Sequence, residues 1–344
     1  MKPVTIVGGG VAGLTVGIGL RQRDVPVTVW EAGHYPRHRV CGEFISGSGQ
    51  QMLARLGLGG ALEAAGAQKA ETAAFFSLDR STGSRTLPRR AIGLSRFKLD
   101  ALLAEKFREL GGQLLEGRRR EAADFGEGVV RATGRRAQAE ADGVRWFGLK
   151  AHARGVPLAA DLEMHISSRG YVGLCRVEGG KVNVCGLFRR RSGEPDRVED
   201  RQEWLRGLPG APLRQKMAAA EFDEGSFCAV AGLSLRPCSA VNREDCCLGD
   251  AITMIPPVTG NGMSMAFESA ELALEPLAGW SRGEISWTDA RRQIARACDA
   301  AFARRLVWAK WLQRLLLAPA LQNALVLLAA RSDGFWRLAF EKTR

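Results

Sequence analysis

The beginning of the chain carries two short apolar runs on either side of a longer one. Val4–Val7 is a β-branched run, an apolar stretch continues from the following glycines to about Leu20, and a last run ends at Glu31. Short apolar runs are typical of buried parallel strands, and the longer one is typical of a helix. The pattern therefore predicts a strand–helix–strand unit.

A second segment has the apolar spacing of an amphipathic helix. Leu99, Phe107 and Leu110 lie on one face of a helix that begins near Arg96. The two glycines at 111–112 are expected to end this helix, and the sequence QLLEG after them is typical of a strand.

The middle of the chain alternates between apolar and polar positions instead. This alternation predicts antiparallel strands over 161–166 and 181–187, with a hairpin turn at VEGGKV. Lys150 and His152 are candidates for polar groups of a site, although a single His more often makes a structural hydrogen bond. The candidates for an apolar interior are Leu162, Met164, Ile166, Tyr171, Val182, Val184 and Leu187.

Another strand-to-helix pattern occurs late in the chain. Cys246–Leu248 is a short apolar run, and Gly249 and Asp250 follow it directly. A loop with two prolines and two glycines then leads into a helix from about Asn261 to Leu274.

The C-terminal segment is helical in pattern, apolar and basic, with interleaved Trp. Residues 291–344 hold eleven Lys/Arg against three Asp/Glu, so they carry +8 of the net charge of +12. Pro319, Gln322 and Asn323 interrupt the apolar run, which is too short and too polar to span a bilayer. Two interpretations remain open: peripheral contact with a membrane surface, or helices that pack over the rest of the protein with a basic exterior. The composition does not favour nucleic acid as a partner.

Composition sets broader limits. The 344 residues, 46% of them hydrophobic and 25% charged, suffice for one large domain or two interleaved domains. The eight cysteines form no C-x-x-C pair, and the start of the chain has no secretory pattern, so we expect free thiols and a cytoplasmic location. Four His and scattered Cys predict no metal site.

The first unit has the spacing of a dinucleotide-binding turn. Gly8, Gly10 and Gly13 follow the pattern G-x-G-x-x-G, with Ala12 in the same turn. Such glycines allow a tight turn, close approach of a pyrophosphate and close packing of the helix, whose N-terminus attracts the phosphates. Glu31 lies where an acid binds a ribose 2′-hydroxyl, and it would repel the 2′-phosphate of NADP. A glycine-rich turn in another kind of α/β protein is the alternative.

The late block resembles the second flavin motif of the p-hydroxybenzoate hydroxylase-like flavoproteins. This superfamily includes aromatic hydroxylases, flavin halogenases and geranylgeranyl reductases. The resemblance implies that Asp250 hydrogen-bonds the ribityl chain of FAD and that the following helix points its N-terminus at the flavin ring. It also implies cofactor contacts at Gly249, Pro257, Gly260, Asn261 and Gly262.

Two further segments resemble parts of the same superfamily. Arg96 precedes a Leu-rich helix, as does an arginine of the superfamily that reaches FAD, so the resemblance implies that Arg96 contacts the cofactor. It also implies that Arg39 contacts the phosphate or ribose of FAD. The motif Pro-x-x-x-x-Cys-Gly-Glu, which ends at Glu43, resembles a motif of the geranylgeranyl reductase branch, in which the Cys faces flavin and substrate. Cys41 is thus a candidate proton donor or a mere space-filler, and Gly42 permits close approach to the ring. Glu43 is a candidate for orienting the substrate or for capping a turn.

Two features depart from the superfamily. The meander of short strands after the strand near 114 is reduced to little or nothing, because only RRREAADFGEG precedes the strand-like VVRATG. The second Asp-Gly motif is also unclear. One candidate is ATGR at 132–135, which follows a predicted strand but has Thr133 in place of the Asp. The other is ADGVR at 141–145, which contains Asp-Gly but follows no predicted strand. The preceding strand favours ATGR.

The resemblance implies an α/β fold: a Rossmann-type, glutathione reductase-like FAD-binding domain interleaved with an antiparallel β-sheet substrate domain and a C-terminal helical segment. The expected parts are FAD-binding segments at 1–72, 95–145 and 241–280, substrate-domain segments at 73–94 and 146–240, and a helical region at 281–344.

The expected function is that of an FAD-dependent oxidoreductase. Monooxygenation of a hydrophobic or aromatic small molecule through a flavin C4a-hydroperoxide is the first interpretation, and saturation of C=C bonds in an isoprenoid or other lipophilic substrate is the second. Halogenation ranks third because Trp-x-Trp-x-Ile-Pro is absent, and a non-catalytic binder of FAD or a lipophilic ligand stays open. No second glycine fingerprint occurs, so NAD(P)H is expected to bind transiently as electron donor; a partner protein that supplies the electrons is the alternative. The oligomeric state is not predicted.

Overall fold

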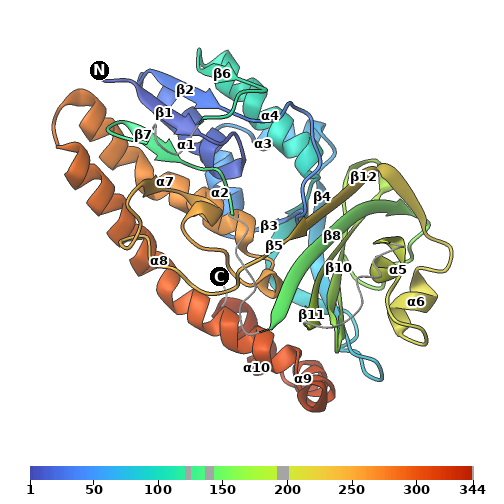
Figure 1. The fold of residues 1–344 in the computed structure, drawn as a ribbon. Coiled ribbons are helices and arrows are strands. Elements are labelled where there is room, and N and C mark those ends of the chain that lie inside the picture. The colour runs from blue at the N-terminus through green and yellow to red at the C-terminus, as the bar shows by residue number, and fades with distance from the viewer. Residues whose placement is uncertain (121–124, 136–142, 192–200, 343–344) are drawn as a thin grey trace.

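Two β-sheets of different kinds form the framework of the protein (Figure 1). The computed structural model describes residues 1–120, 125–135, 143–191 and 201–342. The first sheet is parallel, with the order β13-β7-β1-β2-β6. Its strands are β1 (Val4–Val7), β2 (Val27–Trp30), β6 (Gln113–Leu115), β7 (Val129–Arg131) and β13 (Cys246–Cys247).

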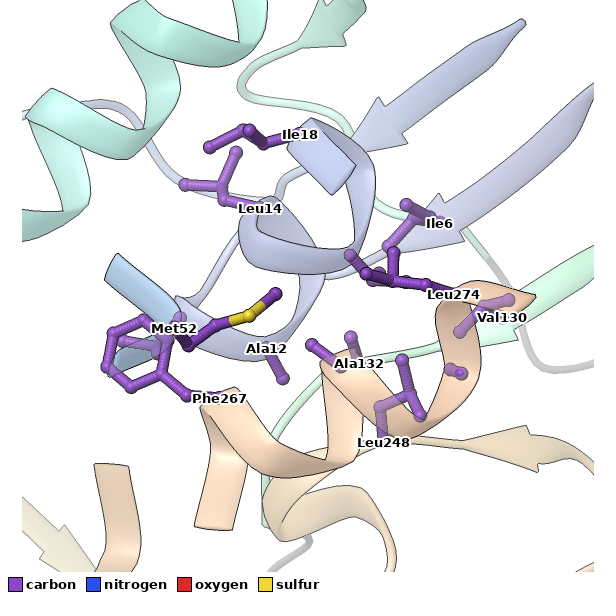
Figure 2. Packing of buried hydrophobic residues seen from close by; sticks show 14 of the residues in the cluster. Ile6, Ala12, Leu14, Ile18, Met52, Val130, Ala132, Leu248, Phe267 and Leu274 are labelled. Atoms are coloured by element: carbon purple, nitrogen blue, oxygen red, sulfur yellow. The ribbon is translucent and has the colours of Figure 1, made fainter. Parts of the chain in front are cut away.

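Two helices that are distant in sequence cover this sheet together. Helix α1 (Val11–Arg21) follows β1, and α7 (Gly262–Arg282) packs beside it. A Cβ at Gly19 would lie 2.6 Å from Leu274, so the two helices are as close as a glycine allows. Figure 2 shows Leu274 beside Ile6 and Val130 in this core. Helix α4 (Arg96–Glu109) also packs on α1.

The second sheet has eight strands in the order β12-β8-β11-β10-β9-β4-β5-β3 and is antiparallel except for the parallel pair β4 and β9. Its strands are β3 (Phe44–Ser46), β4 (Gln68–Phe76), β5 (Arg85–Gly93), β8 (Val144–Arg154), β9 (Leu162–Ser167), β10 (Gly170–Arg176), β11 (Val182–Arg191) and β12 (Glu221–Ala231). The sheet includes β3 and the start of β4, which lie within residues 1–72, the segment predicted to bind FAD. The predicted domain boundaries themselves stay predictions.

The remaining helices lie around these sheets. Between the strands are α2 (Ser48–Arg55), α3 (Gly59–Ala64), α5 (Arg201–Arg206) and α6 (Pro212–Lys216). The chain ends in α8 (Trp287–Leu316), α9 (Pro319–Arg331) and α10 (Asp333–Glu341). Helix α8 runs from α7 toward the foot of the eight-stranded sheet, where α9 and α10 lie (Figure 1).

The two faces of the eight-stranded sheet serve different purposes. One face packs with α5 and α6 in a core that contains Leu149, Val182 and Val184. The opposite face packs with the C-terminal helices in a core that contains Met164, Tyr171 and other apolar residues. Six of the seven residues predicted to be interior are buried and Leu162 is half-buried; strand alternation places Val182 and Val184 in the first core and Met164 in the second.

Most elements agree with the sequence patterns. The strand–helix–strand unit, the helix after Ser95, the strand after it and the VEGGKV hairpin are all present. Helix α7 is longer than expected: it continues through Pro276 to Arg282, because Leu277 and Trp280 are buried beyond the proline. In the described parts of the segment between β6 and β7 there is no strand, in agreement with the reduced meander.

Candidate functional site

A cavity of about 1120 Å³ lies between the two sheets, α7 and the C-terminal helices. This volume exceeds the roughly 300–1,000 Å³ typical of pockets for one small ligand. The predicted site residues that line it are Gly8, Gly10, Ala12, Glu31, Arg39, Cys41, Gly42, Glu43, Arg96, Asp250, Pro257, Gly260 and Gly262. Gly13, Gly249 and Asn261 do not line it. The structure thus brings together segments from four distant parts of the sequence.

The three glycines of the first turn have different surroundings. A Cβ at Gly8 would lie 2.3 Å from the Ala132 carbonyl oxygen, and one at Gly13 would lie 1.9 Å from the Gly8 oxygen. At Gly10 the nearest atom to such a Cβ is Nη2 of Arg96, 3.9 Å away. The outer two glycines are therefore required by the fold itself, whereas Gly10 leaves open space on the cavity side. A diphosphate could approach the backbone there.

Two helix N-termini face this cavity. Helix α1 begins after Gly10 and α7 begins after Asn261, and neither start has a side-chain cap. Gly260 has φ +61, the left-handed conformation that glycine favours, and a Cβ at Gly262 would meet no atom within 4 Å. Uncapped N-termini offer free backbone N–H groups and a partial positive charge. Both ends could therefore hold negative charge on one ligand.

Glu31 lines the end of the cavity next to Gly8 and Gly10, which we call the outer end; the end next to Cys41 and Glu43 is the inner end. Its carboxylate accepts hydrogen bonds from the backbone N–H groups of Gly9 and Gly33, both at 2.8 Å, and from the Arg37 guanidinium. Burial alone would raise the pKa of Glu31, but the hydrogen bond and charge of Arg37 lower it to about 2. Arg39 lies 3.8 Å from the same carboxylate. The side chain is therefore an ionised acceptor, fixed in orientation, as binding of a ribose hydroxyl requires.

Arg96 connects the outer end to the middle of the cavity. Its guanidinium makes two 2.7 Å hydrogen bonds to the fully buried Asp100, one turn further along α4. Burial by itself would lower the pKa of Arg96, but the charge of Asp100 raises it. Arg96 thus stays charged between Gly10 and Cys41, in line with the expected contact to a bound cofactor.

Asp250 faces the cavity from the turn after β13. Burial raises the pKa of Asp250, although the positive charges of Arg135 and Arg96 oppose this effect. A carboxyl group in this setting gains from hydroxyl partners, which replace lost water. The predicted contact with a ribityl chain fits this requirement.

A buried cluster of ionisable groups lies under the inner end of the cavity. Glu43 Oε2 lies 2.7 Å from His152 Nε2, and Oε1 lies 3.3 Å from Lys150 Nζ; all three side chains are almost fully buried. Glu43 also accepts a hydrogen bond from the backbone N–H of Arg96 at 2.9 Å. Burial would raise the pKa of Glu43, but the His152 hydrogen bond and the Lys150 charge lower it. His38, which lines the cavity, completes the cluster with Nδ1 3.1 Å from Lys150 Nζ.

This cluster also places three metal-ligating side chains near one another. Single ligand atoms of His38, Glu43 and His152 all lie within 4.8 Å of one another, which the sequence did not suggest. However, the Lys150 ammonium contacts both His38 and Glu43. A cation is thus already present at this position, and the arrangement favours an ion-pair network over a metal site.

The cluster holds the loop that carries Cys41 and Gly42. Asn183 donates a hydrogen bond to the Cys41 carbonyl at 3.0 Å. Burial raises the pKa of the Cys41 thiol, although the Arg96 charge opposes this, so the thiol stays protonated. No atom lies within 4 Å of a Cβ built on Gly42, so a flat ring could approach the backbone here.

Small side chains widen the cavity over the eight-stranded sheet. Gly173, Cys185 and Cys228 line the cavity, and strand pairing places them in one row with the buried Lys150 across β10, β11, β8 and β12. Burial raises the pKa of Cys185 to about 12, so this thiol acts as a small apolar group. The C-terminal helices complete an apolar wall with Leu312, Leu316, Leu325, Val326, Ala329, Trp336 and Phe340.

Several lining residues were not identified from the sequence. His38 and the Arg118–Arg120 run line the cavity, and the Arg120 guanidinium lies 5.7 Å from the Trp30 ring centroid. The basic run directly after β6 was a usable signal, because it follows the strand next to Glu31. ATGR at 132–135 lines the cavity after β7, as its context suggested, while part of ADGVR lies outside the described residues.

Comparisons with known proteins agree with this architecture. Residues 6–44 match the model of the NAD(P)-binding Rossmann-like domain, and no curated protein matches the chain. The flavin-dependent brominase Bmp2 has 17% sequence identity and a TM-score of 0.74, with 99% of this chain and 92% of that chain covered. PqsL, a probable FAD-dependent monooxygenase from Pseudomonas aeruginosa, has 17% identity, a TM-score of 0.69, and 95% and 99% coverage.

A third similar structure comes from the reductase branch. A geranylgeranyl bacteriochlorophyll reductase-like protein from Thermoplasma acidophilum has 16% identity and a TM-score of 0.74, with 100% of this chain and 97% of that chain covered. Identities this low relate the folds only. The chain therefore has the fold shared by these flavoproteins, which confirms the fold class expected from its glycine and Gly-Asp motifs.

Proposed function

We propose that the chain is an FAD-dependent oxidoreductase that hydroxylates a hydrophobic or aromatic small molecule. One observation carries the proposal: two uncapped helix N-termini, the open face of Gly10 and the ionised Glu31 line the same cavity that the C-terminal helices close with an apolar wall. The negative charge of FAD lies on its central diphosphate, which suits the start of α1 at Gly10, and a volume above the usual range for one ligand suits a second, lipophilic molecule. FAD would supply two-electron reduction of oxygen.

The chain's own residues would divide the work between the two ends. Gly10 and the start of α1 would hold the diphosphate, Glu31 the adenosine ribose, and Asp250 the ribityl chain. The start of α7 would stabilise negative charge that develops on the reduced ring. The apolar wall would exclude water from the reacting centre. NAD(P)H is the electron donor that we propose, bound only transiently.

Reduction of a C=C bond is the second candidate, because of one observation. Cys41 lines the cavity beside Gly42, and burial raises its thiol pKa, so a proton is held where a ring and a substrate would meet. In this reaction the thiol would donate that proton to carbon after hydride transfer.

Titration of the purified protein with FAD, followed by anaerobic photoreduction and rapid mixing with oxygen, tests the proposal. We expect tight binding, then reoxidation through a transient species whose spectrum differs from those of oxidised and reduced flavin. Failure of the folded protein to bind FAD would contradict the whole proposal. Slow, featureless reoxidation together with anaerobic saturation of an added isoprenoid would select the reductase instead.

A further inference from the structure

The outer face of α8 carries a stripe of exposed apolar side chains. Val307, Trp308, Trp311 and Leu315 follow one another at helical intervals and are between 36% and 56% exposed. Leu321 and Leu328 on α9, the next helix, are exposed as well. Large apolar side chains gathered in this way on a surface mark a contact with another apolar phase.

The segment that carries this stripe is positively charged, although Glu268 of α7 pairs with one of its arginines, Arg305. Residues 303–331 contain five Lys/Arg and no Asp/Glu. Arg304 lies on the stripe one turn before Trp308, while Lys310 and Arg314 flank it, and the Arg314 guanidinium lies 5.7 Å from the Trp311 ring centroid. Trp and Arg next to each other are typical of the interface between lipid headgroups and acyl chains.

The inner faces of the same helices form the wall of the cavity. Leu312 and Leu316 of α8 and Leu325 and Val326 of α9 line it. The stripe and the cavity are therefore separated by the thickness of one helix layer. No single helix in the described residues is long and apolar enough to cross a bilayer, and α8 with α9 meets those criteria only as a pair bent by 112°.

We propose that the α8 stripe, with its flanking cations, docks the protein on the surface of an anionic lipid bilayer. The Trp and Leu side chains enter the acyl-chain boundary, and Arg304, Lys310 and Arg314 contact the headgroups. If the proposed function holds, docking places the apolar cavity wall next to the phase in which a lipophilic substrate dissolves. The docking itself does not depend on bound FAD.

A second copy of the chain fits this surface less well than lipid does. Face-to-face pairing would bring the cations of two stripes together, and the stretch 303–331 offers no carboxylate to neutralise them. The net charge of +12 adds to this repulsion.

Co-sedimentation with vesicles tests the proposal. Full-length protein is mixed with vesicles of phosphatidylcholine alone or of phosphatidylcholine with phosphatidylglycerol. We expect strong binding only to the second kind. Each cation removed should weaken binding about fivefold, so Arg304→Gln/Lys310→Gln/Arg314→Gln should weaken it on the order of a hundredfold. Val241→Ala, which truncates an exposed apolar side chain outside these helices, is a control and should bind as wild type does.

Brominated lipids locate the contact independently of affinity. They should quench tryptophan fluorescence in the wild type, and Trp308→Phe/Trp311→Phe should retain binding but lose this quenching. Quenching that persists in this variant, or absence of binding to anionic vesicles by folded wild-type protein, would overturn the proposal. A lipid-free dimer that Trp308→Ala/Trp311→Ala dissociates would assign the stripe to a second copy and would also overturn it. Vesicle binding without FAD binding would leave this inference standing while the proposed function fails.

Discussion

The two ends of the cavity are each organised around a buried glutamate, but by different means. At the outer end, Glu31 is held by Gly33 and Arg37, which are close to it in sequence, and by the amide of Gly9 in the same strand–helix–strand unit. At the inner end, Glu43 is held by Lys150 and His152, more than a hundred residues away. The outer end is therefore built from one stretch of the chain, while the inner end exists only when distant strands of the eight-stranded sheet, β3 and β8, are assembled.

This difference explains how the two glutamates should respond to change. Glu31 accepts hydrogen bonds from backbone amides, and the nearby Arg39 is half exposed to solvent. A neutral side chain at position 31 can therefore keep part of this hydrogen bonding. Glu43 and Lys150 are both 0% exposed, so each depends on the other for neutralisation.

The largest effect is expected from Glu43→Gln. It leaves the Lys150 ammonium buried without its carboxylate, which should lower the free energy of unfolding by about 3–5 kcal/mol. The equivalent change at the outer end, Glu31→Gln, should cost less, about 1–3 kcal/mol, because the glutamine oxygen still accepts a hydrogen bond from one of the two amides. Urea denaturation measures both.

A double variant tests the cause. Glu43→Gln/Lys150→Met removes both charges and should recover much of the stability lost in Glu43→Gln alone. If the double variant is as unstable as the sum of the two single variants, then the two charges do not stabilise the fold through each other.

The next effect concerns Gly10→Val. The side chain would enter the open space at the start of α1, so we expect FAD affinity to fall by about a hundredfold or more while folding is retained. Gly13→Ala should instead destabilise the fold, because its Cβ would lie 1.9 Å from a carbonyl oxygen. Visible absorbance of bound flavin and thermal unfolding separate the two outcomes.

Gly59→Ala serves as the control for these substitutions. Gly59 is an exposed glycine at the start of α3, and a Cβ there meets no atom within 4 Å. Both flavin binding and stability should be unchanged or slightly better. Wild-type flavin affinity in Gly10→Val would show that this glycine does not face the ligand.

The contrast between the two ends also shows what the sequence could reveal. Glycine spacing, the acid at Glu31 and the Gly-Asp turn are short-range signals, because a backbone turn and a helix start are built from adjacent residues. The partners of Glu43 could not be found in this way. Lys150 and His152 reach it only through the register of β8 between β11 and β12, and no local pattern encodes that register.

A smaller effect is expected in the pH dependence of stability, to which His38 at the inner end and Glu31 at the outer end contribute in different pH ranges. Burial and the charges of Lys150 and His152 lower the pKa of His38 to about 4, from an ordinary value of 6.5. Between pH 4 and 6.5 the unfolded chain binds a proton at His38 that the folded chain does not. The contribution of His38 to the free energy of unfolding is therefore fully present above pH 6.5 and is lost as the pH falls toward 4. For Glu31, with a pKa of about 2 against 4.5 when unfolded, the loss occurs between 4.5 and 2.

Difference curves isolate these two contributions. Unfolding free energies of the flavin-free protein are measured against pH for wild type, His38→Gln and Glu31→Gln. His38→Gln should flatten the curve only in the upper window, and Glu31→Gln only in the lower one. A His38→Gln curve parallel to that of wild type between pH 6.5 and 4 would refute the charge environment assigned to the inner end.

The smallest effect is expected from Cys41→Ala, and it decides what the inner end does. If Cys41 only fills space beside the ring, oxygen-dependent reoxidation of the photoreduced protein should stay within about threefold of wild type, since the change removes one small apolar group. If the thiol is a proton donor to carbon, anaerobic saturation of an isoprenoid should fall by about 10²–10⁴ in this variant. Cys41→Ser distinguishes chemistry from packing, because the hydroxyl keeps a proton and nearly the same volume. A large loss in both oxygen reactivity and flavin binding would instead make Cys41 part of the cofactor cradle, and the division of labour between the two ends would then be wrong.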